Sequence, residues 1–127
     1  MVKVLIDTDI IIDFLRTKKG LLLDLYRLQS EEKLELYISS ITALELFSGI
    51  SSKKLKLTLL ELISTLKVVG ITLDLAVFAG ELKRDLQSSI PFADLLIGAS
   101  ALYIRAQLAT HNQKHFKGIP KLKFVKS

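Results

Sequence analysis

Three acidic residues stand where an apolar segment ends or begins, which is an unusual place for a charge. Asp7 follows the apolar run 2–6, Glu45 lies inside the apolar segment 41–47, and Asp94 opens a long apolar segment. Carboxylates that gather in one place repel one another unless a cation lies among them, and Mg²⁺ binds oxygen ligands. If the three segments meet in space, their side chains would form a divalent-metal site.

The charge of the whole chain suggests what such a site would act on. Lys and Arg outnumber Asp and Glu by 18 to 13, for a formal net charge of +5. Positive surface favours a polyanion, and a metal site in a basic protein suggests a nuclease. We interpret Asp7 and Asp94 as direct metal ligands. Glu45 is longer, so it could bind directly or through a water and orient the attacking water, and no His is obviously placed as a general base.

A structural explanation exists for each of these acids. Asp7 could cap the helix that follows it, and Thr42 with Glu45 forms the Thr-x-x-Glu pattern of a capping box. Asp94 at a helix start is favoured by the helix dipole. These explanations are compatible with a metal site, because both place carboxylates at the same strand-to-helix hinges.

Length and composition limit the remaining possibilities. We expect residues 1–127 to form a single domain. The absence of Cys excludes disulfides and Cys-ligated zinc and fits a reducing, cytoplasmic location. The start of the chain does not resemble a signal peptide, and no apolar run approaches the roughly 20 residues that cross a bilayer. No membrane association is therefore expected.

The elements that must position the acids alternate between strand and helix, which predicts an α/β fold with a parallel sheet flanked by helices. The predicted strands are 2–6, 35–39, 67–71 and 107–110, with 122–125 as a possible edge strand. The predicted helices are 9–16, 21–31, 42–49, 53–66, 74–86 (capped by Asp74), 94–106 and a turn at 112–116. The helix 94–106 is apolar nearly all round and should be buried.

One acid does not fit this arrangement easily. Ligands of open parallel sheets bind beyond the carboxyl ends of the strands, where Asp7, Glu45 and the segment 110–112 are expected. Asp94 begins the helix that leads into the strand 107–110. We therefore expect Asp94 at the opposite edge, unless the preceding loop folds back.

Four segments together resemble a known family. Segments 5–12, 41–49, 92–101 and 108–116 are similar, in this order, to those of PIN-domain proteins and, among these, of the VapC-like toxins of toxin–antitoxin pairs. Each motif alone is weak, but four in order over nearly the whole chain are specific. The resemblance implies a PIN-like fold with a central parallel sheet of four to five strands, and with the acids in one cleft.

The resemblance also implies roles for individual residues. Asp7, Glu45 and Asp94 match the metal-binding acids of the family, and Asn112 matches a fourth catalytic position that is often Asp. Because Asn112 is neutral, the number of metals, one or two, stays open. Thr110 matches a hydroxyl residue that borders the pocket. Family members cleave RNA with Mg²⁺ or Mn²⁺, often form homodimers, and are silenced by a VapB-like antitoxin.

Polar residues near these motifs are interpreted more simply. Asp9 could line the cleft, while Asp13 is expected to pair with Arg16 or to face solvent. His111 and His115 are four residues apart, a spacing that can bind zinc, but no third ligand accompanies them. We interpret both as surface histidines. Asn112 could also cap the helical turn that follows it.

Three other functions remain to be compared with the nuclease. The Asp7-Thr8-Asp9 motif resembles the start of haloacid-dehalogenase-like phosphatases, but a paired-acid motif at Asp94 is missing. A receiver domain would need an Asp at the end of the third strand, which stops at Gly70-Ile71. A catalytically weak PIN-fold module that only binds RNA or a partner is kept open by the neutral Asn112.

Overall fold

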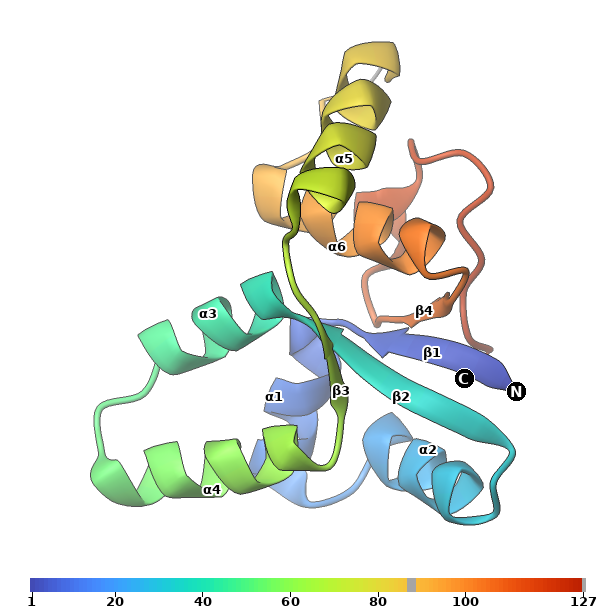
Figure 1. Cartoon of the computed structure of the whole chain (residues 1–127). Coiled ribbons are helices and arrows are strands. Elements are labelled where there is room, and N and C mark those ends of the chain that lie inside the picture. The colour runs from blue at the N-terminus through green and yellow to red at the C-terminus, as the bar shows by residue number, and fades with distance from the viewer. Residues whose placement is uncertain (87–88, 127) are drawn as a thin grey trace.

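A computed structural model describes residues 1–86 and 89–126. Its centre is a sheet of four parallel strands in the order β3-β2-β1-β4, with helices packed on both faces (Figure 1). The strands are β1 (Val2–Ile6), β2 (Leu34–Ser39), β3 (Lys67–Val69) and β4 (Gln107–Ala109). The helices are α1 (Thr8–Thr17), α2 (Leu21–Ser30), α3 (Ser40–Ser48), α4 (Lys53–Ser64), α5 (Leu73–Asp85), α6 (Phe92–Tyr103) and the short 3₁₀ helix η1 (Gln113–Phe116).

The strand order reverses beside β1. Strands β2 and β3 extend the sheet on one side of β1, whereas β4 pairs with its other side, so that Val4 is the register partner of both Leu36 and Gln107. Such a reversal opens a crevice beyond the carboxyl ends of the two diverging strands, and ligands of open α/β sheets bind there. In this chain the point of reversal, which we call the crevice, lies after Ile6 and Ala109.

The two faces of the sheet pack against different helices because side chains alternate along each strand. Val4 and Ile6 face a core shared with α1, α2 and α4, while Leu5 faces α6 on the other side. All three side chains are almost completely buried. Figure 1 shows the same division, with α5 and α6 on one face and α1, α2 and α4 on the other.

Helix α6 is covered on all sides, as its apolar sequence predicts. It packs against α5, β4 and η1, and every residue from Leu95 to Ala101 is buried. A Cβ on Gly98 would lie 2.4 Å from Cδ1 of Ile119, so this glycine permits the close approach of the C-terminal segment. In the part of the chain that the structure describes, no helix has the length and apolarity to cross a membrane.

Three local predictions are wrong. Helix α3 starts earlier than predicted, with Ser39 as its cap, so Thr42 lies buried inside the helix and forms no capping box. Helix α5 is capped by Thr72, whose side chain accepts from the Leu75 N–H, and not by Asp74. The predicted edge strand 122–125 is only an isolated bridge between Leu108 and Phe124, flanked by two backbone hydrogen bonds.

Candidate active site

Asp7 is held at the junction of β1, α1 and β4. Its backbone N–H donates to the Ala109 carbonyl (2.9 Å), which keeps the ends of β1 and β4 together. Its Oδ1 accepts from the Thr8 N–H (2.8 Å), and its Oδ2 accepts from Thr110 Oγ1 (2.7 Å). Only 7% of Asp7 is exposed. The residue therefore caps α1 and faces the crevice at the same time, which agrees with both interpretations of its position.

Thr8 connects the first motif to Glu45. Its Oγ1 donates to Oε1 of Glu45 (2.7 Å) and lies 3.2 Å from Oγ1 of Thr42. Glu45 stands on α3, 37 residues further along the chain. This hydrogen bond fixes the direction of the Glu45 side chain. Oε2 takes no part in it and can contact another group.

Asp9 links α1 to the loop after β4. Its Oδ2 accepts from the His111 N–H (2.9 Å) and from Nδ2 of Asn112 (3.0 Å). Its Oδ1 is buried and has no hydrogen-bond partner among the described residues. A buried carboxylate oxygen without a donor is costly unless a cation or water satisfies it.

Asp94 lies in the first turn of α6, at the same carboxyl edge of the sheet as the other acids. Its Oδ2 is 3.9 Å from Nδ1 of His115, and 22% of its side chain is exposed. The expected position at the opposite edge is wrong. A helix that leads into a parallel strand runs antiparallel to that strand, so its N-terminus starts at the carboxyl edge and needs no loop that folds back.

Burial and mutual repulsion raise the pKa of two of these acids. Burial raises the pKa of Asp7 from its ordinary 3.8 to about 6, and the negative charges of Asp9 and Asp94 add to this, against the hydrogen bonds from Thr110 and Thr8. Burial also raises the pKa of Asp94, where Glu45 and Asp9 act in the same direction and His115 opposes them. The acids thus act on one another across the crevice.

Whether a divalent cation fits this site depends on the carboxylate oxygens that the acids offer. Oxygen donors with raised pKa values and an orphaned oxygen on Asp9 are what an Mg²⁺-like ion would satisfy. Within residues 1–86 and 89–126, no three His, Asp or Glu side chains already stand in a metal-binding group. Mg²⁺ keeps several of its waters and needs only one or two carboxylates, so the donors present fit it.

The polar residues near these motifs agree in part with their predicted roles. Asn112 does not cap η1, since its side chain donates to Asp9 instead. Asp13 is not paired with Arg16; its side chain is partly exposed, in line with the alternative that it faces solvent, and its Oδ2 lies 3.9 Å from Nε2 of His111. His115 is exposed, as predicted, and its Nδ1 also lies 3.9 Å from Oδ2 of Asp94, beside the acid cluster.

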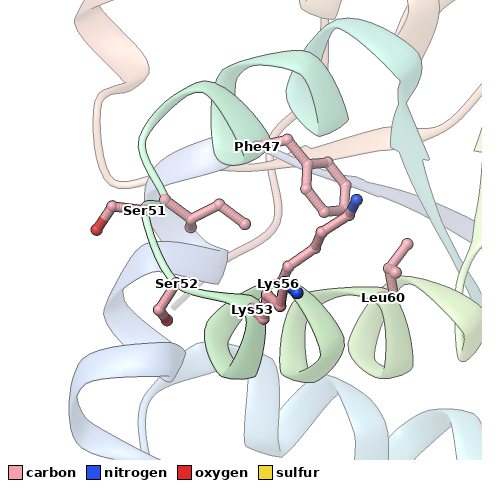
Figure 2. Close-up of a pocket in the computed structure, with 7 residues that line it drawn as sticks. Phe47, Ser51, Ser52, Lys53, Lys56 and Leu60 are labelled. Atoms are coloured by element: carbon pink, nitrogen blue, oxygen red, sulfur yellow. The ribbon is translucent and has the colours of Figure 1, made fainter.

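Beside the acid cluster lies an apolar groove. A pocket of about 430 Å³ between α1, α3 and α4 includes Glu45 and Arg16 in its lining, together with Ile12 and Leu55. A second pocket of about 580 Å³ continues it at Ile50. Figure 2 shows this second pocket, with Phe47, Lys53, Lys56 and Leu60 around it. Glu45 lines the first of these pockets and not the second.

Comparison with known proteins agrees with the fold and the motifs. Ribonuclease VapC19 of Mycobacterium tuberculosis is 33% identical over 121 residues, which cover 93% of this chain and 95% of the relative.

Solved structures show the same architecture. A crystal structure of VapBC2 from Rickettsia felis bound to a promoter DNA fragment contains a chain that is 27% identical, with a TM-score of 0.85 and 98% of both chains covered. DNA-bound VapBC from Salmonella typhimurium, at 24% identity and a TM-score of 0.84, likewise covers 98% of both chains and has the same fold. The PIN domain family model matches residues 4–122, and the chain therefore belongs to the PIN domain family.

Proposed function

We propose that this protein is a divalent-metal-dependent endoribonuclease and the toxin of a toxin–antitoxin pair. The proposal is supported by acids from three separate elements that lie near enough for their charges to act on one another, Asp94 on Asp7 and Glu45 on Asp94. The PIN family membership and the likeness to Ribonuclease VapC19 support RNA as the substrate. We further propose that the protein acts in the cytoplasm as a single domain.

The side chains divide the chemistry between them. We assign Asp7 and Asp94 as ligands of Mg²⁺ or Mn²⁺, and Glu45 as a third acid that binds directly or through water. The bound cation supplies neutralising charge at the phosphate and lowers the pKa of the attacking water. Thr8 holds one oxygen of Glu45, so the other is free to accept a proton from that water.

The remaining polar groups position this machinery. Thr8 and Thr110 donate to the two oxygens of Asp7 and so fix its carboxylate plane. Asn112 and the His111 N–H hold Asp9, which keeps the loop after β4 against α1. Asn112 therefore acts in the site by orienting a carboxylate, and it adds no negative charge. A single cation is consistent with this neutral position.

The partner is proposed to be a VapB-like antitoxin that covers the groove beside Glu45. An inhibitor must block the crevice, and the groove offers exposed apolar side chains next to it, including Ile12 and Leu55. An amphipathic helix or strand from the antitoxin would bury these residues. VapBC complexes among the structural relatives support such a partner.

The direct test is cleavage of a single-stranded RNA by the purified protein. Cleavage is expected with Mg²⁺ or Mn²⁺, loss of cleavage with EDTA, and loss of at least about a hundredfold in rate for Asp7→Asn, which removes a negative charge aimed at the cation. Asp24→Asn is the matched control, because Asp24 is an exposed carboxylate on α2 outside the crevice. Equal rates for Asp7→Asn and Asp24→Asn would refute the assignment.

The second candidate function is a PIN-fold module that binds RNA without cutting it. The neutral Asn112 favours this candidate, because it reduces the charge available for a second cation. Tight RNA binding with no product in either metal would establish the binding module in place of the nuclease.

A further inference from the structure

The last quarter of the chain has a charge distribution that the acid cluster does not explain. Asp94 is the final acidic residue, and the 33 positions after it contain six Lys and Arg but no Asp or Glu. The six are Arg105, Lys114, Lys117, Lys121, Lys123 and Lys126. This segment begins beside the crevice and passes the opposite edge of the sheet at Arg105 and again at Lys121 and Lys123, so its positive charge is found at both edges.

Part of this charge lines a pocket at the amino edge of the sheet, which we call the amino-edge pocket. It has a volume of about 550 Å³ and lies where β1 and β4 begin and α6 ends. Its lining includes Lys3, Arg105, Lys121 and Lys123, and its described lining contains no carboxylate. Arg105, Lys121 and Lys123 are exposed, and none of them forms a salt bridge within residues 1–86 and 89–126.

The backbone that presents Arg105 is unusual. The end of α6 forms a Schellman motif, in which the Ala106 N–H donates to the Ala101 carbonyl (2.8 Å) and the Arg105 N–H to the Leu102 carbonyl (3.1 Å). The residue at the left-handed position of this motif is usually glycine, but here it is Arg105, with φ 60°. Lys121 is also left-handed, with φ 67°. A left-handed backbone is unfavourable for a residue other than glycine, yet both positions have a cationic residue that lines the same pocket.

The C-terminal segment is fixed against the sheet, so these cations keep their places. The Leu108 N–H donates to the Lys123 carbonyl (2.8 Å), and the Val125 N–H donates to the Leu108 carbonyl (2.9 Å). From η1, beside the acid cluster, the chain returns to the amino edge, where Lys121 and Lys123 line the pocket, and it then pairs in parallel with β4 at Phe124. At about 3.3 Å per residue, the length of β1 separates the two edges by roughly 16 Å.

We propose that the amino-edge pocket is an RNA-binding exosite, in which Arg105, Lys121 and Lys123 contact backbone phosphates of the RNA outside the cleaved bond. The proposal rests on the ribonuclease function, because it assigns the same RNA a path from the crevice to this pocket. An RNA backbone fits better than an isolated anion, since the charges are spread along a track and are exposed to solvent. Single-stranded nucleic acid is bound by grooves with positive charge that follow its backbone.

The test compares short and long RNA on a cleavage-deficient background, Asp94→Asn. Oligomers of about 4 and about 16 nucleotides would be titrated at several salt concentrations. For the long RNA, Arg105→Gln/Lys123→Gln should bind roughly tenfold more weakly at 0.1 M salt, and the slope of log K against log[salt] should fall by about 1.4, the value for two lost phosphate contacts. Binding of the short RNA should not change.

The matched control is Lys19→Gln/Lys54→Gln, which removes the same net charge. Lys19 and Lys54 are exposed and lie on the other face of the sheet. Lys19 is in the turn between α1 and α2, and Lys54 is on α4. This control should bind both oligomers as the parent does. Melting temperatures report whether each variant folds, and Lys121→Gln/Lys123→Gln replaces the first variant if Arg105→Gln does not fold.

The outcomes separate the two proposals. Equal binding of long RNA by the parent and the pocket variant, equal losses for the pocket variant and the control, or a loss that is the same for short and long RNA would overturn the exosite. Cleavage of the short RNA by the otherwise wild-type protein tests the nuclease alone. If that cleavage is absent, the ribonuclease assignment fails, whereas a length-dependent binding loss still supports the pocket.

Discussion

At the scale of single residues, the Asp7-Thr8-Asp9 motif organises the crevice. The three side chains reach two other parts of the chain: Asp7 and Asp9 contact the segment after β4, and Thr8 contacts Glu45 on α3. A helix cap alone would need only one of them. The motif therefore brings together segments that are more than 30 residues apart in the chain.

The raised pKa of Asp7 predicts a pH-dependent stability. The folded protein holds the Asp7 proton up to about pH 6, whereas the unfolded chain releases it near 3.8. The folded state binds more protons in this interval, so this residue lowers the free energy of unfolding as the pH rises from 3.8 to 6. In metal-free buffer at pH 7.5, Asp7→Asn should be more stable than the parent by up to about 3 kcal/mol.

The measurement is urea denaturation of both proteins between pH 3.5 and pH 8, with EDTA present. The gain of Asp7→Asn should shrink as the pH falls from 6 to 3.8 and be small at pH 3.5, where Asp7 is mostly protonated in both the folded and the unfolded state. A gain that is constant over the whole range would show that Asp7 is not the titrating group.

The orphaned oxygen of Asp9 and the raised pKa of Asp94 predict stabilisation by metal. A cation that binds only the folded state adds about 2.7 kcal/mol at a concentration of 100 Kd. Millimolar Mn²⁺ or Mg²⁺ should therefore raise the melting temperature of the parent by several degrees, and that of Asp94→Asn much less. Thermal unfolding with and without metal provides the check, with Asp24→Asn as control, and an equal shift in all three proteins would place the cation elsewhere.

At the scale of elements, α6 decides where Asp94 lies. The helix is buried on every side, runs antiparallel to β4, and starts at the carboxyl edge of the sheet. Its packing against the C-terminal segment depends on Gly98, which lies beside Ile119. An error in this packing would move Asp94 relative to Asp7 and Glu45.

Substitutions at two helical glycines should change the stability of the protein in opposite directions. Gly98→Val should destabilise the protein by about 1–3 kcal/mol, because its side chain would enter space held by Ile119 and Phe116. Gly80→Ala on α5 should stabilise it by about 0.5–1 kcal/mol, because nothing lies within 4 Å of the added Cβ and alanine favours the helix. Chemical denaturation measures both, and destabilisation by Gly80→Ala would contradict the placement of this helix face.

At the scale of the whole molecule, α5 leaves an apolar surface uncovered. Leu73 and Val77 are 79% and 52% exposed, and they lie four positions apart on α5, so they share one face. Contiguous exposed apolar surface of this kind marks interaction sites. We propose that a second copy of the chain covers it, as the expected homodimer requires.

The dimer is tested by sedimentation of a charged variant. Leu73→Asp/Val77→Asp should be monomeric at micromolar concentrations where the parent sediments as a dimer, because two carboxylates would be buried at the interface. Leu57→Asp on α4 is the control, since Leu57 is 62% exposed on the other side of the sheet. Dimers that persist in the Leu73/Val77 variant, or a parent that is monomeric, would exclude this face.

The sequence by itself determined the α/β class, the buried character of α6 and the acids worth considering, because periodicity and charge within an apolar segment are local signals. Only the tertiary structure decided the inclusion of Asp9 and His115, whose partners lie on other elements. It also decided that Ser39 caps α3 and Thr72 caps α5. Several residues near each helix start could cap it, and the packing of the helix determines at which one the helix begins. The place of Asp94 at the carboxyl edge follows from helix direction in a parallel sheet, but only the tertiary structure showed that it lies near Asp7 and Glu45.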